Sequence, residues 1–254
     1  MKNILIIGAN SAVANSCLNI WASRGDKLFL VGRDEIKLQG TLDRLELEGM
    51  TNAKAFGMDL NNLKKHQSML DTALSYLKDI DIVLISHGTL PVQSICEQEV
   101  ELTLSEIKTN ALSTISLLTI IANRFEAKRH GTIAVISSVA GDRGRADNYI
   151  YGSAKAMVVT FISGLRQRLH NSNVNVITVK LGRIETPMTI NFKKGLLWVK
   201  SDFAAKKIVS AIDMQKYIVY VPGFWKLIML LFKTIPEAAY VKLPLLKIKL
   251  KIKP

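Results

Sequence analysis

Residues 3–14 read Asn-Ile-Leu-Ile-Ile-Gly-Ala-Asn-Ser-Ala-Val-Ala, a short apolar run that ends in glycine and continues into small residues. The run predicts a buried strand, and the residues after it predict a helix that begins near Ala12. Gly8 can make the tight turn between them, and Ala12 and Ala14 are small enough for close packing. Such a turn suits a pyrophosphate, because free N–H groups and the positive end of the helix dipole face the ligand. The alternative is a turn whose small residues serve packing alone.

The same alternation of apolar runs and amphipathic stretches continues along the chain. Strands are predicted at residues 3–7, 27–31, 53–58, 80–86, 131–137, 174–181 and 217–221. Helices are predicted at residues 12–24, 34–48, 63–78, 97–124, 150–169 and 202–214. The strand candidates are rich in Ile, Val and Leu with little alternation, which indicates burial on both faces of a parallel sheet. The predicted fold class is α/β: a single Rossmann-like, doubly wound parallel sheet of about seven strands with helices on both faces.

The 254-residue chain has the length of one large domain or two small ones. No internal linker is visible, so we expect one domain over residues 1–222 and a basic, apolar C-terminal extension over residues 223–254. The hydrophobic content of 48% excludes a disordered chain, a coiled-coil rod and a collagen-like polymer. The net charge of +13 favours an anionic partner: nucleic acid, a lipid surface or a phosphorylated ligand.

Cysteine and histidine usage argues against a disulfide scaffold or a metal site. Cys17 and Cys96 belong to no CxxC or Cys/His cluster, and the four histidines lie at unrelated spacings. We therefore expect no metal and a reducing compartment. The N-terminal apolar run is too short for a signal peptide, and no stretch of about 18 uncharged apolar residues is present to span a bilayer. A cytoplasmic location is expected.

The second predicted strand ends in Leu-Val-Gly-Arg-Asp at residues 30–34. In a dinucleotide-binding sheet this strand end lies beside the adenosine ribose, where an acidic residue holds a 2′-hydroxyl and an arginine can pair with a 2′-phosphate. Arg33 therefore predicts NADP(H) in preference to NAD(H), with NAD(H) left open. Two alternatives are that Arg33 is a solvated loop cation and that Asp34 neutralises it. After the third strand, Asp59 and Leu60 are placed to contact the adenine edge, although Asp59 fits a helix N-cap equally well.

Tyr151 and Lys155 stand four residues apart at the start of a predicted helix, so their side chains share one face. A phenol is a poor acid–base catalyst at its unperturbed pKa of about 10, but a nearby ammonium stabilises the phenolate. Ser138 follows the fifth predicted strand, and ligands bind at strand C-terminal ends in open α/β sheets. A Tyr-x-x-x-Lys pair alone is usually a surface pair. The order of nucleotide turn, Ser138, Tyr151 and Lys155 favours catalysis instead.

With these features in this order, residues 3–221 resemble the short-chain dehydrogenase/reductase family. The resemblance rests on the turn at 8–14, Asn110, Ile-Ser-Ser-Val-Ala-Gly at 136–141, Tyr151-x-x-x-Lys155, and Gly182 with Thr186. It implies hydride transfer between NAD(P)(H) and a carbonyl/alcohol pair. It also implies a homodimer or homotetramer formed through the helices that hold Asn110 and Tyr151.

The resemblance further implies a role for each motif residue. Tyr151 would be the general acid–base, Ser138 would polarise the carbonyl, and Lys155 would hold the nicotinamide ribose and tune Tyr151. Asn110 would hold a water that links Lys155 to solvent, and Thr186 would bind the nicotinamide carboxamide or a phosphate. The residues expected to bind the cofactor are Gly8, Asn10, Ser11, Ala12, Val13, Arg33, Asp59, Leu60, Ser86, Gly88, Tyr151, Lys155, Gly182, Ile184 and Thr186.

Three motifs depart from the family pattern. Ala12 and Ala14 replace glycines, which could alter cofactor affinity. Ile-Ser-His-Gly at 85–88 replaces the usual Asn-Asn-Ala-Gly, and His87 is either a functional group near the cofactor or a strand-end histidine bonded to backbone. Leu-Gly at 181–182 replaces Pro-Gly and could leave the next loop less rigid. Because the serine, tyrosine and lysine are present, an inactive relative is not expected.

Residues 222–254 hold seven lysines and one glutamate, a net charge of +6 out of the chain's +13. Residues 227–232 are apolar but too few to span a bilayer, so the aromatic and lysine flanks fit a segment in the headgroup zone. Residues 246–253 alternate Leu or Ile with Lys, which gives an extended form one apolar and one cationic face. The extension predicts peripheral membrane contact; the alternatives are an arm closing the substrate pocket and a subunit interface. Nucleic acid is not expected, because residues for base contact are scarce.

The loop at residues 141–149 carries Arg143 and Arg145 near the predicted pocket mouth, where they could meet an anionic substrate group or face solvent. Within the family, residues 149–155 and the extension resemble keto-reductases that work beside an oxidase in epimerising polyprenyl-phosphoryl ribose. That resemblance implies a ketone on a lipid-linked or nucleotide-linked sugar, a partner oxidase, and work at the inner face of a membrane. The alternatives are a soluble family member acting on acyl, steroid-like or other small carbonyls, and a cofactor-binding protein without catalysis.

Overall fold

A seven-stranded parallel sheet runs through the structure, a computed structural model that describes residues 1–243. Its strand order is β3-β2-β1-β4-β5-β6-β9. The strands are β1 (Asn3–Ile7), β2 (Lys27–Gly32), β3 (Ala53–Gly57), β4 (Ile82–Ile85), β5 (Gly131–Ser138), β6 (Val174–Leu181) and β9 (Ile218–Val221). The predicted Rossmann-like sheet of about seven strands is confirmed.

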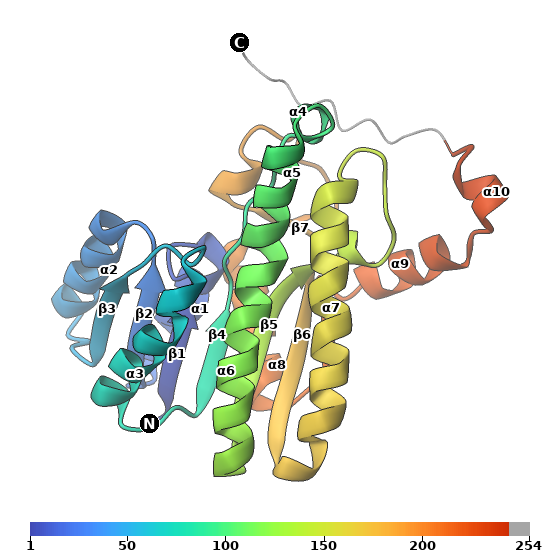
Figure 1. The fold of residues 1–254 in the computed structure, drawn as a ribbon. Coiled ribbons are helices and arrows are strands. Elements are labelled where there is room, and N and C mark those ends of the chain that lie inside the picture. Colours follow the sequence, from blue (N-terminus) through green and yellow to red (C-terminus); the bar gives the residue numbers. More distant parts are fainter. Residues whose placement is uncertain (244–254) are drawn as a thin grey trace.

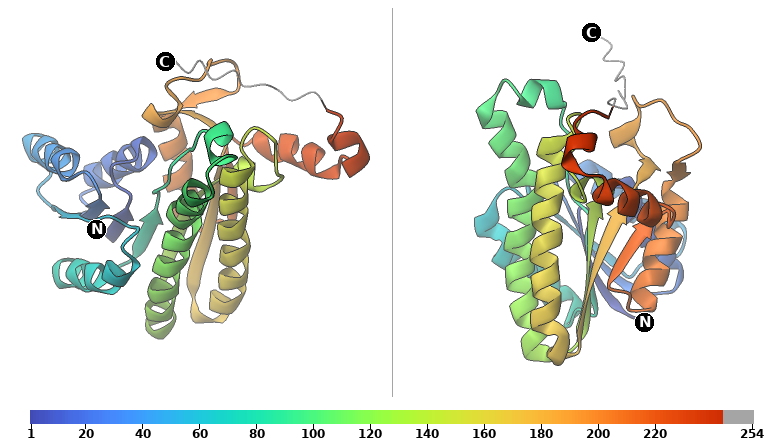
Figure 2. Two further views of the ribbon diagram at one scale, coloured as in Figure 1. Left: turned by 45° about the horizontal axis from the view of Figure 1, so that its top comes forward. Right: turned by 90° about the vertical axis from the view of Figure 1, so that its right-hand side faces the viewer.

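Helices cover both faces of the sheet and make three layers (Figures 1 and 2). The helices on one face are α3 (His66–Leu77), α6 (Ser113–Lys128) and α7 (Tyr149–Leu169). Those on the other are α1 (Ala12–Ser23), α2 (Glu35–Leu47) and α8 (Ser201–Asp213). Strand β1 contributes side chains to the hydrophobic core on each face of the sheet. Leu5 and Ile7 pack on the side of α3, α6 and α7, and Ile4 and Ile6 pack on the side of α1, α2 and α8. A continuous apolar run is therefore what this central strand requires.

The strand order reverses beside β1, since the chain runs outward to β3 on one side and returns to β4 on the other. Ligands of open α/β sheets bind at such a switch point, outside the carboxyl ends of the strands. Two helices begin with side-chain caps at this edge. Ser11 Oγ accepts the N–H of Ala14 at 3.3 Å to start α1, and Asp34 Oδ1 accepts the N–H of Lys37 at 3.0 Å to start α2.

Two predicted helices are more complex than the sequence pattern indicated. In place of one helix at 97–124 the chain forms α4 (Gln93–Cys96), α5 (Val100–Ile107), a π-helical turn (Lys108–Leu112) and then α6. No proline or glycine marks the π turn, so the pattern predicted an unbroken helix. The segment at 63–78 opens with a 3₁₀ turn (Leu63–Lys65) before α3. A small parallel pair, β7 (Arg183–Glu185) and β8 (Trp198–Lys200), was not predicted.

The extension beyond residue 222 is helical in its described part. α9 (Trp225–Thr234) and α10 (Glu237–Tyr240) follow β9 and project from the side of the molecule (Figures 1 and 2). Trp225 and Met229 are buried together with Val139, which directly follows β5. The alternating stretch at 246–253 lies outside the described residues. Within residues 1–243, no helix combines the length and apolarity that crossing a membrane requires.

Candidate active site

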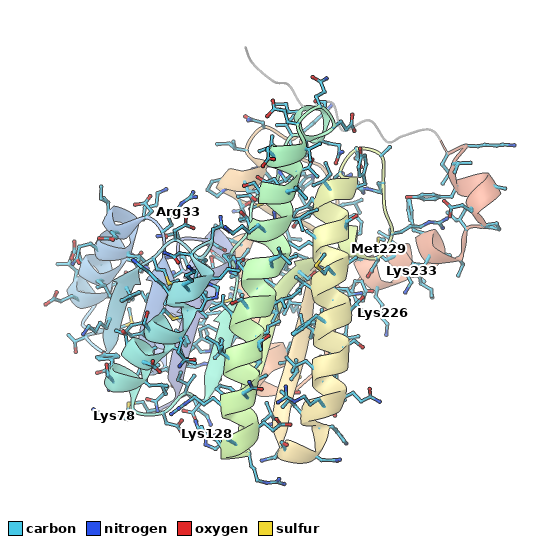
Figure 3. The ribbon with its side chains drawn as sticks, viewed as in Figure 1. Arg33, Lys78, Lys128, Lys226, Met229 and Lys233 are labelled. Atoms are coloured by element: carbon cyan, nitrogen blue, oxygen red, sulfur yellow. The ribbon has the colours of Figure 1, made fainter. Side chains whose placement is uncertain are left out.

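Every residue predicted to bind the cofactor or to act in catalysis lines one cavity at the carboxyl ends of the strands. Its volume of about 1450 Å³ exceeds the roughly 300–1,000 Å³ of common small-molecule sites, so it has room for two ligands. The cavity reaches from Arg33 at the start of α2 (Figure 3) to the loop between β7 and β8. The sequence thus selected residues that the fold brings together, while their individual roles stay predictions.

The turn after β1 has the shape of an anion cradle. Gly8 has a φ of +88°, and a Cβ there would lie 2.5 Å from the backbone nitrogen of His87. Ser11 caps α1, and its hydroxyl lies 2.9 Å from the hydroxyl of Ser86 at the end of β4. Glycine at the turn and the N-terminus of α1 behind it fit the pyrophosphate of a dinucleotide.

Arg33 and Lys37 place two cations at one end of the cavity. Lys37 was not predicted as a site residue. Its position four residues after Arg33 could have indicated that the two side chains lie close together. Asp34 pairs with Lys37, with Nζ and Oδ2 3.1 Å apart, and forms no ion pair with Arg33 among the described residues. The interpretation that Asp34 neutralises Arg33 is therefore wrong. Asn10 fixes this loop, because its side-chain amide bonds the backbone N–H and carbonyl of Asp34 at 3.2 Å each.

Asp59 does not cap a helix. Its Oδ1 accepts the N–H of Asn61 at 2.9 Å, and the next helical turn begins only at Leu63. The N-cap alternative is therefore wrong. Asp59 and Leu60 both line the cavity between the ends of β3 and α3, as expected for residues beside the adenosine.

Ser138 ends β5, and Tyr151 and Lys155 lie in the first two turns of α7. The Ser138 hydroxyl donates to the carbonyl of Leu181 at 3.3 Å and accepts the N–H of Ala140 at 3.1 Å. The Lys155 ammonium lies 5.5 Å from the centroid of the Tyr151 ring. Burial raises the pKa of Tyr151 to about 12, which a hydrogen bond with Ser138 opposes, and burial lowers the pKa of Lys155 to about 8. Tyr151 thus holds its proton at neutral pH beside a cation that can stabilise the phenolate.

Asn110 is fully buried in the π turn and its amide is held on both sides. Oδ1 accepts the N–H of Thr89 at 3.1 Å, while Nδ2 contacts Thr89 Oγ1 at 2.9 Å and a Glu106 carboxylate oxygen at 3.1 Å. A Cβ on Gly88 would lie 2.7 Å from Asn110 Oδ1 and 3.1 Å from Lys155 Nζ. Because Gly88 has no side chain, Asn110 Oδ1 and Lys155 Nζ can both lie close to the backbone at this position. Thr89 and Glu106 were not predicted; the spacing of four between Glu106 and Asn110 on one helix was the signal.

His87 is a neutral side chain bonded to hydroxyls. Its Nε2 lies 2.7 Å from Ser113 Oγ and 3.3 Å from Thr114 Oγ1, so the alternative of a histidine bonded to backbone is wrong. Burial, assisted by the positive charge of Lys155, lowers the pKa of His87 to about 3. The residue lines the cavity without carrying charge at physiological pH.

Arg143 turns away from the cavity and anchors the extension. Its Nη1 donates to the carbonyls of Phe232 and Ile235 at 2.5 and 2.7 Å, and its Nη2 donates to Glu237 at 2.6 Å. The expectation that Arg143 lies at the pocket mouth is therefore wrong. Arg145 does line the cavity.

Trp225, the first residue of α9, lines the cavity and packs against Gly182, where a Cβ would collide with the indole. This contact joins two segments 43 positions apart in the numbering. The start of the extension is therefore a wall of the candidate active site, which agrees with the alternative of an arm closing the substrate pocket, although no local pattern indicated Trp225.

A buried ion pair supports the end of β5 from behind. The side chains of Lys180 and Asp142 are 7% and 2% exposed and form a salt bridge, and the Tyr220 hydroxyl donates to Asp142 at 2.8 Å. Burial and the Asp142 charge raise the pKa of Tyr220. The network ties β6 and β9 to the segment that follows Ser138.

A family model described as short chain dehydrogenase matches residues 2–196. The chain belongs to the short-chain dehydrogenase/reductase family. It is thus an oxidoreductase by family, as its motifs predicted.

An uncharacterized oxidoreductase of Mycobacterium tuberculosis is 25% identical over 241 residues, which cover 95% of this chain and 96% of that protein. An uncharacterized oxidoreductase of Streptomyces coelicolor is 26% identical over 243 residues, with the same coverage of each chain. The finer resemblance to keto-reductases of polyprenyl-phosphoryl ribose is not among these findings.

Solved structures share the fold. A short-chain dehydrogenase from Sphingobium yanoikuyae in complex with NADPH has a TM-score of 0.80 and 23% identity, covering 94% of this chain and 98% of its own. ElxO with NADP bound has a TM-score of 0.78 and 17% identity, covering 87% and 97%. At these identities the likeness concerns the fold, and cofactor and substrate have to be argued from this chain's own residues.

Proposed function

We propose that this short-chain dehydrogenase/reductase uses NADPH to reduce a ketone to a secondary alcohol. The observation that supports this most is the meeting of Ser138, Tyr151 and Lys155 in a cavity whose far end carries Arg33 and Lys37. Two similar structures are NADP and NADPH complexes, and a 7α-hydroxysteroid dehydrogenase neighbour is complexed with NADH. NADP(H) is therefore the preferred cofactor in this proposal, and NAD(H) is the one to compare.

NADPH, when bound, supplies the hydride that adds to the carbonyl carbon and becomes NADP⁺. The Ser138 hydroxyl redirects its hydrogen bond from the Leu181 carbonyl to the substrate oxygen. Tyr151 transfers its phenolic proton to that oxygen, so that C=O becomes CH–OH. The Lys155 ammonium stabilises the phenolate that remains, and Asn110 holds the water through which the proton is replaced. Positioned general acids of this kind contribute about 10²- to 10⁴-fold in rate.

The substrate we propose is a ketone on a lipid-linked or nucleotide-linked sugar, made by a partner oxidase. The size of the cavity and the cations that line it beyond the cofactor end support a large anionic substrate. A soluble enzyme acting on acyl, steroid-like or other small carbonyls is the second candidate, favoured by the indole of Trp225 in the wall.

We also propose that α9 contacts an anionic membrane surface. Leu227, Leu230 and Leu231 are 63%, 56% and 59% exposed on the side of α9 opposite the buried Met229. Lys226 and Lys233 flank them (Figure 3), and the sequence carries four more lysines at 247–253. An exposed apolar face with cationic flanks is the pattern of helices that lie in the headgroup zone.

Vesicle co-sedimentation tests this contact. Removing the whole extension would also remove Trp225 from the cavity wall and uncover Val139, so the informative variant changes Leu227, Leu230 and Leu231 to Gln. Its matched control changes Ile36 and Leu47, two exposed apolar residues of α2. We expect the wild type and the control to bind anionic vesicles, less at high salt, and the α9 variant to stay in solution. Equal sedimentation of all three proteins would refute the contact.

A homodimer or homotetramer through the Asn110 and Tyr151 helices is a further part of the proposal. Leu104, Leu112 and Met157 are exposed apolar residues on these elements. Analytical ultracentrifugation should show an oligomer for the wild type and a smaller species for Leu112→Glu. A wild-type monomer would contradict the assembly.

The reaction itself is tested by following NADPH oxidation with a panel of keto-sugars, acyl ketones and steroid ketones, with NADH in parallel. We expect turnover with a keto-sugar and a preference for NADPH. Turnover with only acyl or steroid ketones favours the second candidate. NADPH binding without turnover of any ketone would refute the reductase proposal and favour a binding protein.

A further inference from the structure

The cavity wall carries its charges unevenly. Among the described lining residues, the carboxylates are Asp34 and Asp59, both at the adenosine end with Arg33 and Lys37. Apart from Lys155, the lining cations elsewhere are Arg145, Arg183, Lys193 and Lys194. No described carboxylate lines the cavity beside these four, although Asp147 pairs with Arg145 and Glu185 pairs with Lys194 at 3.5 Å from outside the lining. Arg183 and Lys193 form no ion pair among the described residues, so the reacting end keeps an excess positive charge that attracts an anion.

Arg183 is half-buried and lacks a partner. Its guanidinium makes no hydrogen bond or ion pair with any residue in 1–243, and its central carbon lies 6.0 Å from the centroid of the Trp198 ring. A cation–π contact at this distance does not use the guanidinium N–H donors, so they stay available for an anion. Among the other arginines of the described chain, only Arg33 and Arg124 are equally unpartnered, and Arg124 is exposed on α6.

Arg145 lines the same cavity as Arg183, and its charge acts on Arg183. Arg145 pairs with Asp147 at 3.2 Å. Burial lowers the pKa of Arg183, the Arg145 charge lowers it further, and Asp147 opposes this effect. Two partly buried cations therefore share one carboxylate, which leaves an excess positive charge that a ligand can neutralise.

Both arginines belong to segments that position the reacting groups. Arg183 follows Leu181 by two residues, and the Leu181 carbonyl accepts the hydrogen bond of Ser138. Arg145 lies in the turn before α7, six residues ahead of Tyr151. An anion held by the arginines would thus lie on the substrate side of the cavity.

We propose that Arg183, assisted by Arg145, forms a subsite for a phosphoryl group on the substrate. This inference rests on the proposed ketone reduction and adds the substrate class: a ketone that also carries a phosphate or diphosphate. A phosphoryl group suits this subsite, because its oxygens can accept from the free guanidinium fork of Arg183. The fork of Arg145 is engaged by Asp147, so Arg145 assists mainly through its positive charge.

The test measures pyrophosphate binding to the NADPH-saturated protein by calorimetry, so that the cofactor's own pyrophosphate site is filled. Arg183→Gln should weaken binding by at least about tenfold, as expected for loss of a charge-assisted hydrogen bond. Arg183→Lys should recover part of the affinity, and the matched control Arg124→Gln should leave it unchanged. Absence of pyrophosphate binding to the wild type, or equal affinity in Arg183→Gln, would overturn the subsite.

A second readout separates this inference from the proposed reaction. Dihydroxyacetone phosphate and dihydroxyacetone are ketones with and without the phosphoryl group. Arg183→Gln should lower kcat/KM for the phosphorylated ketone and spare the neutral one. If no ketone is reduced while pyrophosphate binding depends on Arg183, the subsite stands and the reductase proposal fails. If both ketones are reduced and Arg183→Gln affects neither, the subsite fails alone.

The phosphoryl group can belong to a nucleotide or to a lipid. Competition by uridine diphosphate and by farnesyl phosphate for the pyrophosphate site distinguishes the two sources. Stronger displacement by either one supports the subsite and identifies its source, and displacement by neither contradicts it.

Discussion

The guanidinium carbon of Arg143 lies 3.6 Å from the centroid of the Tyr240 ring. This contact joins the loop between Ser138 and Tyr151 to the last described helix of the extension. Tyr240 also donates its hydroxyl to the carbonyl of Gly144 at 2.7 Å. The extension is therefore fastened to the loop that leads into α7, the helix that carries Tyr151 and Lys155.

Arg143→Ala should release α9 and α10 from that loop. We expect faster tryptic cleavage at Lys226 and Lys233, and a lower kcat because Trp225 is no longer held against Gly182. Arg168→Ala, which removes the surface ion pair with Glu126, is the matched control and should change neither measurement. Identical proteolysis of the two variants would contradict the anchoring role.

Arg33→Gln should shift cofactor preference toward NADH. Loss of a phosphate contact removes at least about tenfold in kcat/KM for NADPH and leaves NADH unaffected, because NADH lacks the 2′-phosphate. Lys37→Gln should have a smaller effect, since Asp34 already pairs with Lys37. Steady-state kinetics with both cofactors measure the shift. A parallel loss with NADPH and NADH would show that Arg33 does not read the phosphate.

The pH dependence of ketone reduction should follow Lys155. Burial lowers its pKa to about 8, so Lys155 loses its charge as the pH rises through that value, while Tyr151, with a pKa of about 12, keeps its proton. The phenolate then lacks its stabilising cation, and kcat/KM should fall by about tenfold per pH unit above pH 8. Lys155→Met should be slow throughout and lack this decline. A decline of the same shape in Lys155→Met would rule out the assignment.

Asp142→Asn should destabilise the fold by about 3 kcal/mol, because it leaves the Lys180 charge buried without a partner. Asp213→Asn breaks the half-exposed pair with Arg24 and should cost only about 0–1 kcal/mol. Urea unfolding of both variants gives the comparison. Equal midpoints would mean that the buried pair contributes no more than a surface one.

Local patterns in the sequence were enough to predict the sheet and part of the site, and the family resemblance supplied the other site residues, among them Asn110 and Thr186. The apolar runs of β1 and β5 require burial on both faces, and Gly8, Ser138 and Tyr151 follow or adjoin strand ends that the fold brings to one edge. Contacts between distant segments were not visible in the same way. The packing of Trp225 on Gly182 depends on where α9 lies, and no residue near either position signals it.

Local sequence patterns also did not reveal the hydrogen-bond partners of polar side chains. Arg143 was expected at the pocket mouth because its loop precedes α7. Its guanidinium instead donates hydrogen bonds to the carbonyls at the end of α9. The π turn around Asn110 lacks any glycine or proline to mark it, so the long helix appeared unbroken. In both cases the decisive hydrogen bonds join groups whose relative positions only the fold defines.

The central claim is that Tyr151 donates the proton in an NADPH-dependent ketone reduction. The most direct measurement compares NADPH binding and NADPH oxidation for the wild type, Tyr151→Phe and the control Tyr149→Phe, an exposed tyrosine on the same helix turn. We predict that all three proteins bind NADPH with similar affinity and that only Tyr151→Phe loses turnover, by about 10²- to 10⁴-fold. Turnover by Tyr151→Phe at the wild-type rate would contradict the account.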